Sequence, residues 1–293
     1  METTVFGKTG RLVSRIGFGG AVAGLKNYLH EYDPASSEAK AGVHEALEAA
    51  LEHGISYFDT APGYGNGASE TLFGDVLGGV EPERIFLATK CSAFSNEGGV
   101  SDYDHVLRSA EQSLKRLRRD FVDLLQLHGG SYTDAQTERV MGEKGALEAL
   151  EKLKKDGVVR HIGFTTEDNN RAMYEFFRSG RFDSVQLCYN FLFQHPYEPS
   201  RPFGSLYEAE KKGLGIAAMR ATTSGTFQRW MRAVRPGDNF DYTSALIQFV
   251  LSNPLVDVVL IGMRSKERVL QNVAIMDDAS GRVDLSLIHE RYV

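Results

Sequence analysis

The sequence has few of the residues that mark disulfide scaffolds, nucleic-acid binding or membrane insertion. Its 293 residues include two cysteines, Cys91 and Cys188, whose wide separation is not that of a disulfide framework or a metal site. The net charge of −6 gives no basic footprint for nucleic acid. No apolar run approaches the roughly 20 residues of a membrane helix. The opening Met1-Glu2-Thr3-Thr4 lacks the charged and apolar regions of a signal peptide. We therefore predict a cytoplasmic protein with reduced thiols and with no nucleic-acid or membrane partner.

Helical and strand patterns alternate along the chain after an initial hairpin signal, in which apolar and polar residues alternate around Gly7-Lys8-Thr9-Gly10. Several strands are continuous apolar runs, which favours parallel strands covered by helices. The length alone fits one α/β barrel as well as two smaller domains. Strict alternation favours an α/β fold, a (β/α)₈ TIM barrel with an N-terminal β-hairpin, with residues 1–293 as one domain. The predicted strands lie near Ile16, Ile55, Ile85, Val122, Val159, Val185, Ile216 and Val258, and the predicted helices span about 36–53, 69–78, 103–119, 143–156, 167–179, 203–212, 242–252 and 266–276.

Four polar residues stand at the ends of three successive predicted strands. Asp59 and Tyr64 follow an apolar run that breaks at Pro62, and Lys90 and His128 each end a further apolar run. Active sites of barrels lie at the carboxyl ends of the strands. We therefore predict that these four side chains meet at the mouth of the barrel.

Each of the four residue types has a use in protonating a carbonyl oxygen. A tyrosine phenol, with a reference pKa of about 10, is too weak an acid to protonate a carbonyl at neutral pH unless a charge such as that of Lys90 lowers its pKa. Asp59 would compensate the buried ammonium, and a neutral His128 would donate a hydrogen bond to the substrate oxygen. Taken singly, an Asp is more often a helix cap, a Lys is solvated, and Tyr57 or Tyr64 packs a core. Their combination favours a proton-donating site.

The segments around these residues resemble those of the aldo-keto reductase family over nearly the full length of the chain. The resemblance implies an NAD(P)H-dependent oxidoreductase that reduces an aldehyde or a ketone, with Tyr64 as proton donor. It also implies a cofactor that lies extended across the barrel mouth without a Rossmann domain. The matching segments are Phe58-Asp59-Thr60-Ala61-Pro62, Tyr64-Gly65, Ser69-Glu70, Leu87-Ala88-Thr89-Lys90, residues 113–117, residues 120–128, and the opening residues 6–10 and 13–19.

The run Gly17-Phe18-Gly19-Gly20 does not predict a Rossmann dinucleotide site. No clear helix follows it, and the acidic partner and the βαβ spacing are missing. We interpret these glycines as positions where the backbone passes close to the barrel mouth.

The resemblance assigns further residues to the nicotinamide end of the cofactor. Thr165 and Thr166 stand where relatives usually have a Ser-Asn pair, and Thr166 lacks the amide of Asn. Gln186 matches a glutamine that donates to the nicotinamide amide, and a purely structural role is its alternative. Met219 takes the ring-stacking position, because a thioether can lie against a flat ring, although Met at a strand end is more often core. Arg220 is expected at the pyrophosphate or at a substrate anion.

A basic segment near the C-terminus resembles the adenosine end of the family's cofactor site. Ser265 is predicted to cap the following helix. A helix N-terminus with two arginines nearby is an anion site, which favours a 2′-phosphate and hence NADPH over NADH. The alternative is a solvated basic face of an ordinary helix. The residues assigned to this end are Gly262, Arg264, Arg268, Gln271 and Asn272.

Substrate contacts are expected from loops, as is usual in barrels. Residues 222–236, which carry Trp230, are predicted to form an extra helix over the mouth. The chain ends soon after the last helix, which predicts an open site for varied small carbonyl compounds. Packing of a loop is the alternative role for each aromatic candidate. The candidates are Tyr28, His30 and Tyr32 after the first barrel strand, and Phe191, Phe193 and His195 after the sixth.

Two other functions fit parts of the same pattern. An NAD-linked sugar (aldose) dehydrogenase would use the same tetrad, so only Arg264 and Arg268 distinguish it from an NADPH-dependent reductase. A cofactor-binding regulatory subunit that senses redox state is a further alternative. The presence of both Tyr64 and Lys90 argues against that third function.

Overall fold

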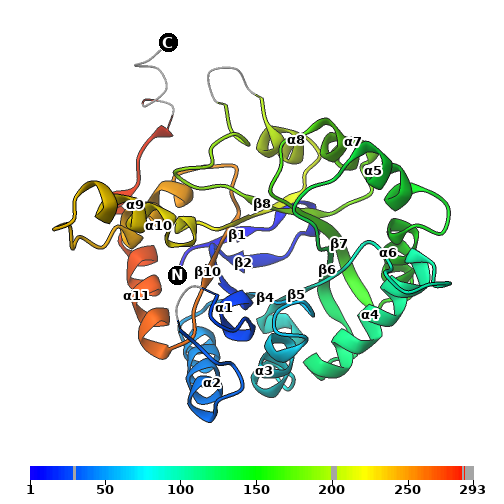
Figure 1. Cartoon of the computed structure of the whole chain (residues 1–293), viewed down its shortest axis with the longest axis horizontal. Helices are drawn as coiled ribbons and strands as arrows, with labels where there is room; N and C mark the ends of the chain where they lie inside the picture. Colours follow the sequence, from blue (N-terminus) through cyan, green and yellow to red (C-terminus); the bar gives the residue numbers. More distant parts are fainter. Residues whose placement is uncertain (29–30, 199–202, 286, 288–293) are drawn as a thin grey trace.

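A closed barrel of parallel strands forms the centre of this computed structural model, which describes residues 1–28, 31–198, 203–285 and 287. Within that described part, the eight barrel strands follow the order β10-β3-β4-β5-β6-β7-β8-β9. Helices surround the strands, as Figure 1 shows. The predicted (β/α)₈ barrel with an N-terminal hairpin is confirmed.

The barrel strands lie close to the predicted positions, although β4 begins at Tyr57 rather than near Ile55. Every residue of β4, β5, β6 and β8 is buried, because side chains fill the barrel on one face and helices cover the other. This double burial accounts for the continuous apolar runs. The strands are β3 (Ile16–Gly19), β4 (Tyr57–Asp59), β5 (Phe86–Cys91), β6 (Val122–Leu127), β7 (Val159–Thr166), β8 (Ser184–Cys188), β9 (Gly215–Met219) and β10 (Val258–Gly262).

The predicted helices correspond to α2 (Ser37–Glu52), α3 (Ala68–Leu77), α4 (Asp102–Leu117), α6 (Ala146–Lys155), α7 (Arg171–Ser179), α8 (Ser205–Lys211), α10 (Thr243–Leu251) and α11 (Lys266–Asp277). The expected helix within residues 222–236 is α9 (Thr226–Val234). Short 3-10 turns are η1 (Gly7–Thr9), η2 (Pro82–Arg84), η3 (Thr223–Gly225) and η4 (Ala279–Gly281). Among the described helices, none is both long and apolar enough to cross a membrane.

Two helices were not predicted. One is α5 (Asp134–Met141), which begins with a capping box between Thr133 and Gln136. The other is α1 (Ala21–Gly24), a single turn directly after the glycine run. The prediction that no helix follows that run was therefore wrong. A Cβ on Gly24 would lie 2.3 Å from the backbone oxygen of Tyr64, so this glycine lets α1 pack directly against the turn that carries Tyr64.

The N-terminal hairpin closes the end of the barrel where the strands begin. Its strands β1 (Thr3–Val5) and β2 (Leu12–Ser14) are antiparallel, and Gly10 takes the positive φ of 68° that the turn needs. Between them Phe6 is fully buried, with its ring edge-on to Tyr57 at 5.3 Å and to Phe86 at 5.4 Å. The hairpin therefore supplies an apolar floor to the barrel.

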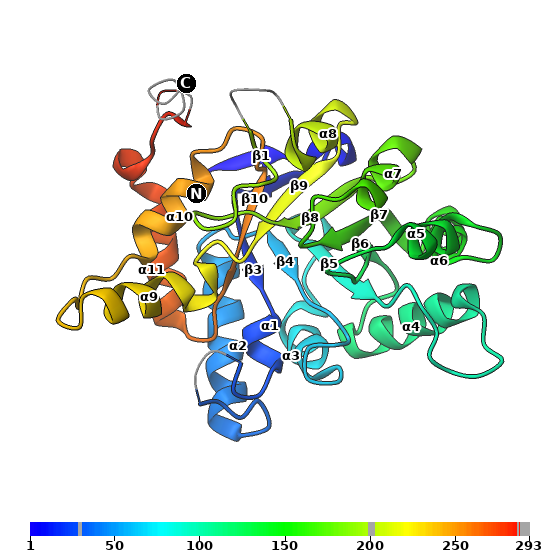
Figure 2. The same cartoon turned by 45° about the horizontal axis from the view of Figure 1, so that its top comes forward.

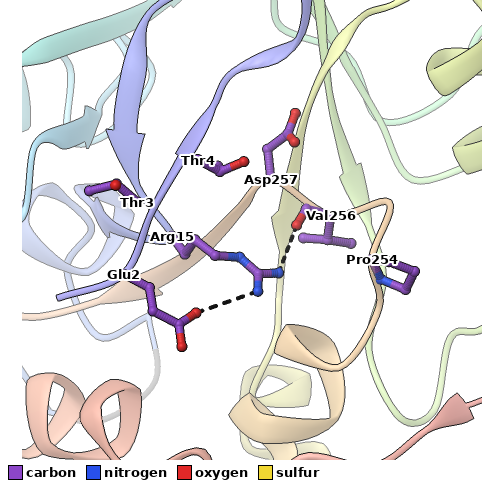
Figure 3. A pocket seen from close by; sticks show the side chains of 7 residues that line it. All are labelled: Glu2, Thr3, Thr4, Arg15, Pro254, Val256 and Asp257. Atoms are coloured by element: carbon purple, nitrogen blue, oxygen red, sulfur yellow. Dashed lines mark hydrogen bonds and ion pairs between the residues drawn. The ribbon is translucent and has the colours of Figure 1, made fainter.

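A polar pocket lies beside this floor, and Figure 3 shows its side chains. Arg15 bridges its two walls: the guanidinium lies 3.6 Å from Glu2 and donates to the backbone oxygen of Val256 at 3.0 Å. Asp257, which precedes β10, accepts from the backbone N–H of Ile216 at 2.9 Å. Because these residues lie where the strands begin, the pocket is at the opposite end from the strand-end tetrad. Its contacts fasten the N-terminal segment to the barrel.

Removing the floor should cost stability without touching the mouth. We expect Phe6→Ala to lower the free energy of unfolding by about 3–5 kcal/mol, because it removes a fully buried ring from a packed core. Denaturant unfolding followed by circular dichroism measures this loss. Phe240→Ala is the matched control, since that ring is 67% exposed and should cost less than about 1 kcal/mol. Equal losses for both variants would contradict the proposed floor.

Candidate active site

The structure brings the four strand-end residues together at the mouth of the barrel. Asp59 is the last residue of β4, Lys90 lies near the end of β5, and His128 directly follows β6. The Lys90 ammonium is fully buried and donates to both carboxylate oxygens of Asp59, at 2.7 and 2.6 Å. A third bond, at 3.0 Å, goes to the backbone oxygen of Thr60. All donors of this buried cation therefore have partners.

Tyr64 and His128 complete the group. Tyr64 lies half-buried in the turn after β4, and the Lys90 Nζ is 4.8 Å from the centroid of its ring. The rings of Tyr64 and His128 meet edge-on, with centroids 5.6 Å apart. A phenol, an ammonium and an imidazole thus face one small volume, as the sequence predicted.

Burial and charge act against each other on these groups. Burial raises the pKa of Tyr64 above its ordinary value, and the Lys90 charge only partly offsets that rise. We expected a net lowering, which the structure does not support; the physical reason is desolvation of the phenolate. Burial also works against the Lys90 cation, but attraction to Asp59 and Tyr64 outweighs it and raises the pKa of Lys90. For Asp59, burial raises the pKa and the bonds from Lys90 oppose it; with both oxygens bonded to the ammonium, the ion pair is the favoured form.

The environment of His128 favours the neutral ring. Burial of the ring, followed by repulsion from Lys90, lowers the pKa of His128 to about 4, although the residue as a whole is partly exposed to solvent. Its backbone N–H donates to Cys91 at 2.7 Å, which fixes the start of the loop after β6. A neutral imidazole at this place can donate one hydrogen bond to a substrate oxygen.

A second buried polar group supports the turn that carries Tyr64. Glu70 is fully buried and accepts from Thr89, the neighbour of Lys90, at 2.6 Å and from Arg116 at 2.6 Å. Ser69 donates to the backbone of Gly20 at 3.0 Å. Glu70 thus fastens α3 to the strand that bears Lys90, and Ser69 fastens it to the backbone that follows β3, which gives both residues of the motif a role.

Gln126 is a site neighbour that the sequence analysis missed. Its side-chain amide donates to Asp59 Oδ1 at 3.3 Å and to Gln186 Oε1 at 3.2 Å. The amide of Gln186 in turn lies 3.6 Å from the sulfur of Met219. The available signal was a polar residue inside an apolar strand, two positions before His128 and therefore on the same face.

Thr165 and Thr166, predicted near the nicotinamide, have backbone partners, and Arg220, predicted at the pyrophosphate or at a substrate anion, has an ionic one. The Thr165 hydroxyl donates to the backbone oxygen of Gly129 at 2.7 Å, and the Thr166 hydroxyl accepts from the N–H of Asp168 at 3.0 Å. Arg220 pairs with Glu167 at 2.6 Å, and both side chains are partly exposed. Thr166 is fully buried, so its contacts stabilise the loop after β7.

The residues predicted for the adenosine end gather where β10 leads into α11. Ser265 caps α11 as expected, and its hydroxyl accepts from the N–H of Arg268. The Arg268 guanidinium donates to Gln271 at 2.9 Å. Arg264 stacks on the ring of Tyr32, with 4.3 Å from the guanidinium carbon to the ring centroid. Gly262 is exposed beside these residues, whereas Asn272 is buried on the inner side of α11.

The aromatic residues predicted to line the substrate site are scattered. Figures 1 and 2 both show α9, which carries Trp230, at the periphery beside α10 rather than across the barrel. None of the α9 residues is buried. The ring of Tyr32 contacts the Arg264 guanidinium. Tyr28, Phe191 and Phe193 are exposed by 42–48%, the His195 ring lies near that of Phe193, and His30 lies outside the described residues.

Comparison with known proteins places this geometry in a family. The Aldo/keto reductase family profile matches residues 15–280. L-galactose dehydrogenase from Arabidopsis thaliana is 29% identical, over 94% of this chain and 88% of that protein. Methylglyoxal reductase YeaE from Escherichia coli is 34% identical, over 84% of this chain and 83% of that protein. The holo form of an aldo-keto reductase from Bacillus halodurans has the same fold, with a TM-score of 0.73 and 23% identity over 95% of this chain and 91% of that one.

The neutral state of His128 can be tested directly. We expect its imidazole to titrate well below the ordinary value of about 6.5 in NMR spectra, with the resonance assigned through His128→Gln. Lys90→Met should move the midpoint upward, because it removes a repelling charge. A midpoint at or above the ordinary value in the wild type would contradict the assigned role as neutral donor.

Proposed function

The chain belongs to the Aldo/keto reductase family, and we propose that it is an NADPH-dependent oxidoreductase that reduces an aldehyde or a ketone to an alcohol. The observation that carries this proposal is the buried Lys90 ammonium, which Asp59 holds with two bonds and which faces the Tyr64 ring at 4.8 Å. We further propose that residues 1–293 act as one domain.

The tetrad residues divide the work on the substrate oxygen. When bound, the nicotinamide cofactor supplies the hydride that the carbonyl carbon accepts. The neutral His128 ring orients the carbonyl by donating a hydrogen bond to its oxygen. Tyr64 transfers its phenolic proton to that oxygen as negative charge develops there. Lys90 stabilises the phenolate that remains, and Asp59 keeps the ammonium charged in its buried place.

The proposed cofactor residues fit a nicotinamide nucleotide. The NH₂ group of Gln186 donates to the sulfur of Met219, a weak acceptor that the carboxamide oxygen of a nicotinamide would replace, and Gln186 is also a hydrogen-bond partner of Asp59. At the other end, Arg264 and Arg268 adjoin the capped N-terminus of α11, which suits the 2′-phosphate of NADPH. The proposed set is Thr165, Thr166, Gln186, Met219, Arg220, Gly262, Arg264, Arg268, Gln271 and Asn272.

A dehydrogenase acting in the opposite direction is the second candidate. It is favoured by the similarity to L-galactose dehydrogenase, which extends over nearly the whole chain. In that direction Tyr64 would accept the proton of a sugar hydroxyl, and the same four residues would serve. Turnover of NADP⁺ or NAD⁺ with aldoses, compared with oxidation of NADPH by aldehydes and ketones, separates the two functions.

Removing the phenolic hydroxyl should abolish most of the chemistry. Tyr64→Phe is expected to lower kcat/KM by about 10²–10⁴-fold, the usual contribution of a general acid. The cofactor affinity should stay nearly unchanged, as titration calorimetry would show. Tyr57→Phe is the control, since Tyr57 is a buried tyrosine in the barrel floor. Turnover of a folded Tyr64→Phe protein at the wild-type rate would remove Tyr64 from its proposed role.

The cofactor preference depends on the arginines of the α11 segment. Arg268→Ala should raise the dissociation constant for NADPH about tenfold, because a charge-assisted hydrogen bond is worth about 1.5–3 kcal/mol before screening. Binding of NADH should hardly change, and the difference should shrink at high salt because Arg268 is exposed. Arg178→Ala, in α7, serves as the control. Equal binding of NADH and NADPH by the wild type would favour the NAD-linked dehydrogenase.

A further inference from the structure

A buried amide joins the Asp59–Lys90 ion pair to the residue proposed to hold the nicotinamide. Gln126 of β6 is fully buried, and its Nε2 lies 3.3 Å from Asp59 Oδ1 and 3.2 Å from Gln186 Oε1. Its own side-chain oxygen is buried and has no hydrogen-bond partner among the residues that the structure describes. Buried polar groups usually have hydrogen-bond partners, and those of Gln126 are all reached through its NH₂ group. These two contacts therefore determine how the amide is oriented.

The charge of Asp59 determines which way both amides face. A carboxylate only accepts hydrogen bonds, so the Gln126 atom beside Asp59 must be the NH₂ group. That NH₂ also lies beside Gln186, which must therefore present its oxygen to Gln126. The NH₂ of Gln186 lies 3.6 Å from the sulfur of Met219, the last residue of β9, and Gln186 is also a direct hydrogen-bond partner of Asp59. The ion pair between β4 and β5 thus fixes the orientation of an amide on β8, three strands beyond β5.

A missing side chain makes this contact possible. Gln126 lies on β6 and Gln186 on β8, with β7 between them. The β7 residue paired in register with Gln126 is Gly163, which is also paired with Ser184 of β8. A Cβ at position 163 would lie 3.3 Å from Gln126 Cγ and 2.3 Å from Ser184 Oγ. The amide of Gln126 therefore passes across a space that any larger residue would fill.

We propose that Gln126 is a positioning residue that holds the NH₂ group of Gln186 toward the mouth, ready to donate to the carboxamide oxygen of the nicotinamide. This inference rests on the proposed function of Gln186. Gln126 itself would not touch the cofactor. Because Asp59 can only accept hydrogen bonds, it would orient the amide of Gln126, which in turn would orient the amide of Gln186 toward the nicotinamide. The ion pair that supports Tyr64 would thereby also help to orient the nicotinamide ring.

The experiment measures cofactor binding rather than turnover. Titration calorimetry of Gln126→Leu with NADPH should show a dissociation constant about two- to tenfold higher than that of the wild type, the usual effect of one lost neutral hydrogen bond. The fragment 2′-phospho-ADP-ribose lacks the nicotinamide ring, so its affinity should stay unchanged. In a Gln186→Ala background, Gln126→Leu should have no further effect on NADPH binding, because it acts through Gln186.

Controls separate this role from a general loss of structure. Gln248→Leu removes another buried glutamine, which donates to the backbone of Ile275 in α11, and it should leave the NADPH-to-fragment affinity ratio unchanged. Gln126→Met, unbranched and without polar hydrogens, replaces Gln126→Leu if that variant does not fold. A ratio unaffected by either Gln126 variant, or an equal effect in both Gln186 backgrounds, would overturn the positioning role alone. If the wild type binds NADPH no more tightly than the fragment, or binds neither of them, the proposed function is overturned as well.

Discussion

The buried ion pair between Lys90 and Asp59 is the constraint on which the mouth of the barrel depends. An ammonium out of contact with water is stable only with an anion and with acceptors for its remaining hydrogens, and these come from Asp59 and the backbone of Thr60. Meeting that need requires β4 and β5 to be neighbours, in a register that puts both residues at the same end. The turn after β4 then has to carry Tyr64 back over the ammonium. The buried bonds of Glu70 hold α3 and β5 in the places that this requires.

The architecture was predictable because it follows from local patterns. Continuous apolar runs such as Val258–Ile261 are typical of strands covered on both faces, and their alternation with helical periods leaves few topologies. The family, and with it an NAD(P)H-dependent oxidoreductase, followed from ordered motifs and is confirmed by the match to residues 15–280. The one-turn helix α1 has no side-chain cap and is too short to show a helical hydrophobic period, so no local pattern predicts it. In contrast, α5 begins with a Thr-x-x-Gln capping box, which is a local signal present in the sequence.

Only those residues of the site that lie at strand ends could be predicted to meet. The tetrad could be assembled from sequence because its residues follow consecutive strands. The net pKa of Tyr64 could not, because it depends on how much water the folded mouth excludes, and burial outweighs the Lys90 charge. The contact between Gln126 and Gln186 joins strands that are not adjacent, and no spacing rule expresses that. The position of a loop residue such as Tyr32, which stacks on Arg264, is set by tertiary contacts that no local pattern expresses.

Gly163 contributes to the contact between Gln126 and Gln186 through the side chain that it lacks. Mutational scans usually shorten side chains, and at a glycine they have nothing to remove. Here the informative change is an addition: one methyl group would lie 2.3 Å from the Ser184 hydroxyl and press on Gln126. Both glutamines and the ion pair would still be present in the chain, yet the contact between them would be interrupted. Such a variant would keep every polar residue of the site and still lose the contact between the two glutamines. The small size of residue 163 is therefore as much a requirement of this contact as the two amides themselves.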